Sequence, residues 1–208
     1  MEEYVSKNEI RPYKELFAGL IKKVRTDLKK VGITFTCNLV GSAKRNLVVR
    51  HHNKGFDCDY QIFIQKNKKN YDATIIKSEF MDCFNKHIPQ NYSKCKDSTS
   101  SITIKKNDNK NDKIEFSFDV VILKNYNDNV LIIRQDKENP SEKYFWNPLP
   151  EMTKHKERFA LIQGNEMWNA LRKTFYKKKM DQIKGKTDKK SFQLLNESVN
   201  EVLKLFND

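Results

Sequence analysis

A glycine–serine pair and three aspartates are the residues of this chain whose types and spacing suit catalysis. Gly41 and Ser42 stand together, Asp57 and Asp59 follow after fourteen intervening residues, and Asp119 comes much later. Phosphoryl transfer needs little covalent help from a protein, because its main requirements are alignment of the triphosphate and neutralisation of the developing charge. Carboxylates brought together can meet the second requirement by holding two divalent cations. The set therefore points to an enzyme of phosphoryl transfer.

The three aspartates lie in segments that read as strands. Asp57 and Asp59 are two positions apart in the β-rich segment 57–65, so their side chains project from the same face. Asp119 lies on the polar side of segment 114–123 with apolar neighbours, where burying a charge without a cation is costly. Mg²⁺ prefers carboxylate oxygens as ligands. If the strands 57–65 and 114–123 are neighbours in the sheet, the pattern therefore predicts a magnesium site. The alternative is structural: the first two aspartates cap a turn and the third pairs with a lysine.

The glycine–serine pair suits the phosphate side of the same reaction. Gly41 lets the backbone approach a phosphate closely, and the Ser42 hydroxyl and nearby amides can donate to triphosphate oxygens. Lys44 follows closely enough to add positive charge. A Gly-Ser dipeptide or a lone Asp-x-Asp is a weak signal, but the ordered set on strands is much more specific.

Hydrophobic periodicity predicts the elements that position these residues. The expected helices are 11–31, 73–87, 151–163, 165–180 and 188–206, with a short helical turn at 42–45. The expected strands are 33–40, 57–65, 102–104, 114–123 and 130–134. This order predicts an α+β fold with a mixed or antiparallel sheet of about five strands and helices packed on one side. The predicted division is a catalytic domain, 1–135, and a short helical C-terminal segment, 136–208.

Composition indicates the partners only broadly. The formal net charge of +13 and a pI near 9.5 favour a polyanionic partner such as RNA, although a Lys- and Asn-rich proteome explains the charge almost as well. The four cysteines form no CxxC pair and no disulfide framework. The N-terminus lacks an apolar leader, and no apolar run approaches the ~20 residues of a membrane span. The expected location is cytoplasmic, without membrane contact.

Taken in order, these motifs resemble the nucleotidyltransferase superfamily of the DNA-polymerase-beta type. The matching residues are Val40-Gly41-Ser42, Phe56-Asp57-Cys58-Asp59-Tyr60 and Phe118-Asp119-Val120. The resemblance covers roughly 10–135. A strand at 101–104 and an Asn147-Pro148 pair ahead of a helix with His155 are similar to the branch of oligoadenylate synthases and bacterial cyclic-oligonucleotide synthases.

The resemblance implies a role for each matching residue. Asp57 and Asp59 are implied to bind two metal ions, Mg²⁺ or alternatively Mn²⁺. Asp119 is implied to bind the catalytic metal and to help activate the acceptor hydroxyl. Ser42 is implied to contact the terminal phosphates of the donor, ATP or another nucleoside triphosphate, and a looser match assigns the triphosphate also to Lys173.

The resulting hypothesis is a metal-dependent nucleotidyltransferase that moves a nucleoside monophosphate to a hydroxyl and releases pyrophosphate. The acceptor is left open between RNA (tRNA above all), a protein side chain and another nucleotide. The segment after Asp119 is short for an oligonucleotide synthase, which favours a macromolecular acceptor or an accessory protein. The alternatives are a non-catalytic nucleotide- or RNA-binding module on the same fold, and a cyclic-oligonucleotide synthase-like defence protein.

Overall fold

A computed structural model describes residues 4–50, 55–108, 113–136, 143–149, 153–163 and 167–207 of the chain. The chain forms two compact units, a sheet unit, Tyr4–Leu149, and a helical unit that contains the described residues after Pro150. The boundary predicted at residue 135 falls between two strands that pair with each other, Asn129–Gln135 and Tyr144–Pro148, and both strands lie in the sheet unit.

The sheet unit has the predicted α+β class, with a larger sheet than expected. Its seven strands are β1 (Ile33–Leu39), β2 (Phe56–Asn67), β3 (Lys96–Asp97), β4 (Ser101–Asp108), β5 (Lys113–Tyr126), β6 (Asn129–Gln135) and β7 (Tyr144–Pro148). They run in the order β1-β2-β5-β4-β3, and β6 pairs with both β5 and β7. β2 and β5 pair in parallel, and the other pairings between described strands are antiparallel. The sheet is therefore mixed.

Two strands were not predicted from the sequence. β3 has only two residues, too few for any periodicity to show. β7 ends in Asn147 and Pro148, residue types that usually indicate a turn, yet it pairs with β6 along its whole length.

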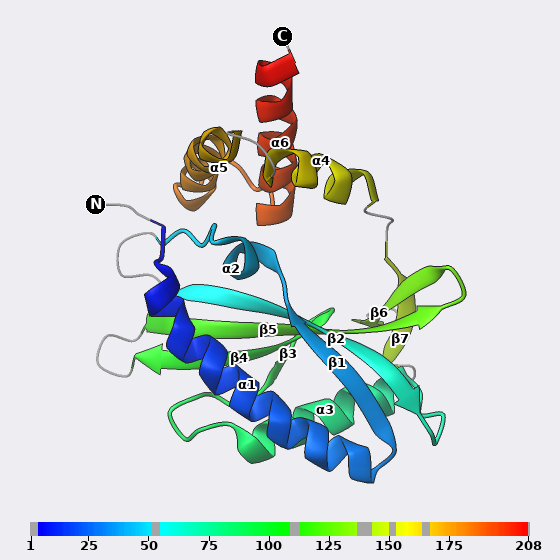
Figure 1. Cartoon of the computed structure of the whole chain (residues 1–208). Coiled ribbons are helices and arrows are strands. Elements are labelled where there is room, and N and C mark those ends of the chain that lie inside the picture. The colour runs from blue at the N-terminus through cyan, green and yellow to red at the C-terminus, as the bar shows by residue number, and fades with distance from the viewer. Residues whose placement is uncertain are drawn as a thin grey trace. The chain divides into compact units, whose positions relative to one another are not determined.

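Two long helices of the sheet unit, α1 (Lys7–Lys30) and α3 (Ala73–His87), cover one face of the sheet (Figure 1). The sequence predicted α3 with these bounds. The predicted start of α1 at residue 11 was too late, because Ser6 and Glu9 form a capping box that begins the helix ahead of Pro12. A short third helix, α2 (Gly41–Arg45), follows β1.

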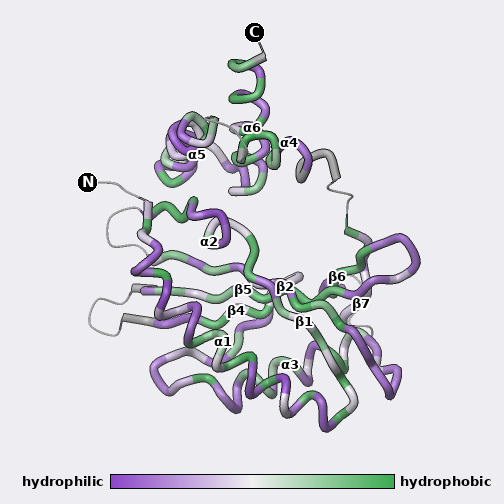
Figure 2. The backbone as a smooth tube through the Cα atoms, viewed as in Figure 1, coloured by the Kyte–Doolittle hydropathy of each residue, from purple (hydrophilic) through white to green (hydrophobic). Residues whose placement is uncertain are grey.

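Aromatic side chains form the core between α1 and the central strands. Phe17 of α1 stacks on Tyr60 of β2, with ring centroids 3.8 Å apart, and lies 4.7 Å from Phe118 of β5. Apolar positions recur along α1, α3 and the central strands, as the hydropathy colouring shows (Figure 2), and the buried ones form a hydrophobic cluster. Because side chains alternate along a strand, the polar residues of β2 and β5 point to the other face of the sheet.

The helical unit consists of α4 (Thr153–Gln163), α5 (Met167–Ile183) and α6 (Ser191–Asn207), close to the predicted ranges. Its buried side chains, including Leu171, Phe175 and Val199, pack the three helices against one another. Among the helices formed by the described residues, none combines the length and apolar character needed to cross a membrane.

A polar cluster joins the C-terminal ends of α1 and α3. The Asp27 carboxylate accepts from Lys86 Nζ at 2.7 Å and from Lys30 Nζ at 2.9 Å, and it lies 2.9 Å from His87 Nε2. Hydrogen bonds from Lys86 first, and then from Lys30 and His87, hold the pKa of the Asp27 carboxyl well below its ordinary value. The charged carboxylate therefore favours the folded state.

We expect Asp27→Asn to lower the urea midpoint of unfolding at pH 7. Because the pKa is depressed in the folded state, the stabilisation is present above the unfolded pKa of 3.8 and is lost as the pH falls below it. The urea midpoints of the two proteins should therefore begin to approach each other below pH 4 and converge toward the depressed pKa of the folded state. Asp82→Asn removes an exposed carboxylate of α3 and is the matched control. A gap between wild type and Asp27→Asn that persists unchanged at low pH would contradict this origin.

Candidate active site

The parallel pairing of β2 with β5 brings the three predicted aspartates together. Asp59 is the register partner of Asp119, and Asp57 lies two residues earlier on the same face of β2. One carboxylate oxygen of each aspartate lies within 4.8 Å of the others. Asp57 is exposed, whereas Asp59 and Asp119 are partly buried. A group of three carboxylates at this separation has the donor type and spacing to bind a divalent cation.

Because side chains alternate between the two faces of β2, Cys58 lies in the core. This residue lies between Asp57 and Asp59 in sequence, but its side chain is buried on the other face of β2. Burial chiefly, with a smaller contribution from the two aspartate charges, raises the pKa of the Cys58 thiol to about 12. Since only a thiolate is a strong nucleophile or metal ligand, Cys58 belongs to the packing rather than to the chemistry.

Thr103 holds one of the three carboxylates in place. It is the register partner of Asp119 across the antiparallel pair β4–β5, and its Oγ1 donates a hydrogen bond to Asp119 Oδ1. The role of Thr103 was not predicted from the sequence. The available signal was a single polar residue between the buried Ile102 and Ile104, which marks a side chain directed to the polar face.

Gly41 lies against Asp59. Its φ of +65° is in the left-handed region, and a Cβ built on it would lie 2.1 Å from Asp59 Oδ2. The backbone N–H of Val40 donates to the Asp59 carbonyl at 2.9 Å, which holds the turn beside the strand. Only glycine therefore allows this approach without displacing the carboxylate.

Gly41 begins the short helix α2, which lies beside the aspartate strand β2. Ser42 is partly buried, and its carbonyl accepts from Leu47 N at 3.0 Å, so the chain turns back directly after the helix. Lys44 is exposed in the last turn. Arg45 donates through NH1 to the Gly41 carbonyl at 3.1 Å.

The structure thus brings together six of the seven residues singled out from sequence, either in the cluster or on α2 beside it. Lys173 lies on α5 of the helical unit, where it is exposed. Its contact with a triphosphate stays a prediction. The side chain of His155 lies outside the described residues, so its role stays a prediction from the family resemblance.

Comparison of the fold with solved structures gives clear matches. Vibrio cholerae DncV in its GTP-bound form matches over 96% of this chain and 52% of its own, with a TM-score of 0.62 and 14% identity. Escherichia coli CdnC with ATP matches over 91% of this chain and 57% of its own, with a TM-score of 0.53 and 15% identity.

A second structure of DncV, described as a cyclic AMP-GMP synthase with the linear intermediate pppA(3′,5′)pG, matches over 69% of this chain and 37% of its own. Its TM-score is 0.50 and its identity 12%. No protein-family model and no curated protein sequence matches the chain.

These matches show that the chain shares the fold of DncV and CdnC. At 12–15% identity the likeness concerns the fold. The chain spans about half the length of the DncV and CdnC structures.

We expect Thr103→Val to weaken the binding of Mn²⁺ by about tenfold or more, because loss of a residue that orients a ligand typically costs this much. Valine keeps the shape of threonine but cannot donate to Asp119. Thr103→Ser retains the hydroxyl and should bind Mn²⁺ nearly as the wild type does. Titration followed by electron paramagnetic resonance measures the affinity. Equal affinity in the valine variant and the wild type would remove Thr103 from the site.

We expect Gly41→Ala to lower the free energy of unfolding by at least about 1–2 kcal/mol, the cost of a side chain in the left-handed region. The new Cβ should also displace Asp59 and weaken Mn²⁺ binding. Gly19→Ala is the matched control, because a Cβ there meets nothing within 4 Å and Gly19 lies in the middle of α1, where alanine favours the helix. Denaturant unfolding and metal titration of both variants test the contact. Unchanged Mn²⁺ binding in Gly41→Ala would show that Asp59 tolerates the added methyl group.

Proposed function

We propose that this chain is a metal-dependent nucleotidyltransferase, which moves a nucleoside monophosphate from a nucleoside triphosphate to a hydroxyl group and releases pyrophosphate. One observation carries the proposal: three carboxylates from two parallel strands meet beside a glycine whose place no other residue can take. A module that only binds anions gains nothing from three acidic groups at its ligand, so this cluster favours metal-dependent turnover over simple binding.

Asp57, Asp59 and Asp119 would hold the metal, with Mg²⁺ preferred for its carboxylate ligands and Mn²⁺ as the alternative. When bound, a divalent cation neutralises charge on the triphosphate and on the reacting oxygens. The number of ions, two in this proposal, follows from the resemblance to the superfamily.

The residues of the turn and of α2 bind the donor in this proposal. The Ser42 hydroxyl donates to an oxygen of the terminal phosphates, and Gly41 leaves room for the phosphate close to the backbone. Lys44 adds positive charge from the last turn of α2. Lys173 is the candidate for a further contact to the triphosphate.

Asp119 acts on the acceptor. Thr103 Oγ1 engages its Oδ1 and limits rotation of the carboxylate. Asp119 then orients the acceptor hydroxyl and takes up its proton as the oxygen attacks the α-phosphate, with pyrophosphate as the leaving group. A base fixed in this way loses little entropy on reaching the reactive geometry.

The proposed acceptor is the hydroxyl of a second nucleotide, so that the product is a linear or cyclic oligonucleotide. The likeness to DncV, a cyclic AMP-GMP synthase solved with a linear dinucleotide intermediate, supports this choice over other acceptors. RNA, suggested by the basic composition, and protein hydroxyls stay predictions, and each enters the assay as a separate acceptor.

We expect labelled nucleoside triphosphates and Mg²⁺ to yield labelled oligonucleotide together with pyrophosphate. Asp57→Asn and Asp119→Asn should each reduce the rate to below about one thousandth of wild type, because such residues act as a unit. Asp128→Asn, an exposed carboxylate in the β5–β6 turn, is the control and should retain full activity. Circular dichroism of each variant separates loss of chemistry from loss of folding.

Two results would contradict the proposal. Nucleotide binding without any labelled product, across nucleotide, RNA and protein acceptors, would identify a non-catalytic module. Transfer that survives in both aspartate variants would remove the cluster from the reaction.

A further inference from the structure

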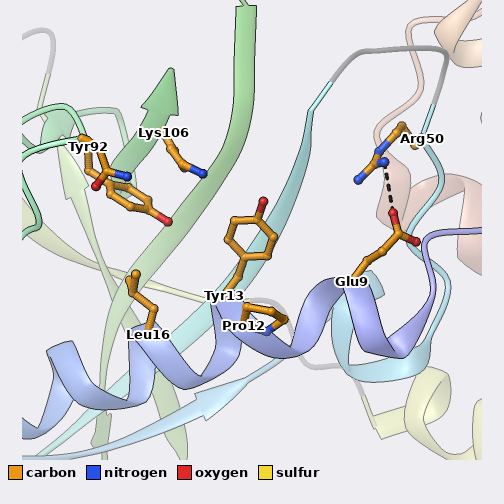
Figure 3. Close-up of a pocket in the computed structure, with 8 residues that line it drawn as sticks. Glu9, Pro12, Tyr13, Leu16, Arg50, Tyr92 and Lys106 are labelled. Atoms are coloured by element: carbon orange, nitrogen blue, oxygen red, sulfur yellow. Dashed lines mark hydrogen bonds and ion pairs between the residues drawn. The ribbon is translucent and has the colours of Figure 1, made fainter. Parts of the chain in front are cut away.

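A cavity lies on the face of the sheet that α1 covers, whereas the aspartates lie on the other face. Its volume is about 350 Å³. Residues of four separate segments contribute to its wall, among them Pro12, Tyr13, Leu16, Arg50, Tyr92 and Lys106. Figure 3 shows these side chains gathered over one face of α1. The nucleotidyl transfer proposed above uses none of them.

The aromatic part of the wall is held rigidly. The Tyr13 ring stacks on Phe116 with centroids 4.0 Å apart and planes 13° from parallel, and its hydroxyl donates to Glu115 at 2.8 Å. Tyr92 lies nearly parallel to Phe118, at 14° and 6.1 Å. Because packing already fixes both tyrosines, a flat ring can bind against them without the entropic cost of ordering them.

Two cations border the same space. Arg50 NH1 contacts Glu9 Oε1 at 3.1 Å, and in Figure 3 the other terminal nitrogen of the guanidinium points toward Tyr13. Lys106 Nζ contacts Glu115 Oε1 at 2.6 Å and lies 5.9 Å from the Tyr13 ring centroid. Each carboxylate here already has a cationic partner. Guanidinium and ammonium groups carry five and three N–H donors, so both retain donors for an anion.

We propose that this cavity binds a small planar aromatic molecule that carries an anionic group, with the ring against Tyr13 and Tyr92 and the anion at Arg50. The site is separate from the aspartate cluster, and its occupant is an effector rather than a substrate.

The cavity has a direct connection to the aspartates through Phe56. The Tyr13 ring meets Phe56 edge-on at 5.4 Å, and the Arg50 guanidinium lies 5.0 Å above the Phe56 ring. Phe56 immediately precedes Asp57 on β2. A ligand that displaces the Arg50 guanidinium therefore acts on the strand end that carries Asp57. This coupling rests on the proposed function, whereas binding to the cavity does not.

Calorimetric titration of the whole chain with 1-naphthyl phosphate, in EDTA to keep the aspartates free of metal, tests the cavity. We expect saturable binding of this probe, and much weaker binding of 1-naphthol, which lacks the anion, and of inorganic phosphate, which lacks the ring. Tyr92→Ala and Arg50→Met should each weaken the affinity for the probe by about tenfold or more. The first substitution removes a side chain that contacts the ring of the probe, and the second removes the cation that binds its phosphate.

Matched controls exist for both substitutions. Tyr126→Ala and Arg134→Met remove an exposed tyrosine and an exposed arginine elsewhere on the sheet and should leave the affinity unchanged. Asp57→Asn should also bind the probe as the wild type does. Absence of saturable binding by the wild type, or equal affinity in the wild type, Tyr92→Ala and Arg50→Met, would overturn the proposal. Thermal unfolding of each variant confirms that a weakened affinity reflects the site.

Reciprocity tests the effector role without an activity assay. If the two sites are coupled, a non-hydrolysable ATP analogue with Mg²⁺ should change the affinity for 1-naphthyl phosphate by about fivefold or more. An unchanged affinity would overturn the effector role. If the ATP analogue fails to bind the wild type, that result would contradict the proposed function and with it the coupling. The titration in EDTA still tests whether the cavity binds 1-naphthyl phosphate.

Discussion

The parallel pairing of β2 with β5 is the constraint on which the rest of the structure depends. Among the described strands it is the one parallel contact, and it sets Asp59 level with Asp119. A parallel pair cannot be closed by a tight turn, because the chain must return to the starting edge of the sheet. Here the return consists of α3, β3 and β4, and β4 also supplies Thr103 to Asp119. One pairing therefore accounts for the cluster and for the residue that steadies it.

The same two strands serve both faces of the sheet. Phe116, Phe118 and Tyr60 meet the aromatic side chains of α1, while the aspartates, at alternate positions of the same strands, face away. Burial of so much apolar surface holds the strands rigidly, and rigid strands are what close-set carboxylates need, since like charges repel. The core thus offsets the electrostatic cost of the site. Gly41 adds a steric condition from outside the core, because the Asp59 carboxylate occupies the space that a side chain at position 41 would need.

Sequence patterns predicted what depends on local order. Alternation placed Asp57 and Asp59 on one face, and helical periodicity gave α3 its bounds. What escaped prediction depends on contacts across the chain. The hydrogen bond between Thr103 and Asp119 depends on the register of β4 against β5, and a bulge after Lys106 shifts that register relative to the end of the hairpin. The two-residue strand β3 forms only because β4 pairs with it. The α1-side cavity joins residues from four distant segments, so no spacing in the sequence could reveal it. The early start of α1 was local and readable, since Ser6 and Glu9 have the spacing of a capping box.

The parallel crossover also determines when the aspartate cluster can exist during synthesis. Asp57 and Asp119 are 62 positions apart, and β5, which carries Asp119, pairs with both β2 and β4. A growing chain that has completed β2 already displays two of the three carboxylates, but the third can join them only after β5 has left the ribosome and found its partners. Contacts at such separation close slowly, because the loop entropy must be lost before the pairing compensates for it. A growing chain that stops before β5 therefore has no complete set of carboxylates, although α1, β1 and β2 are already present.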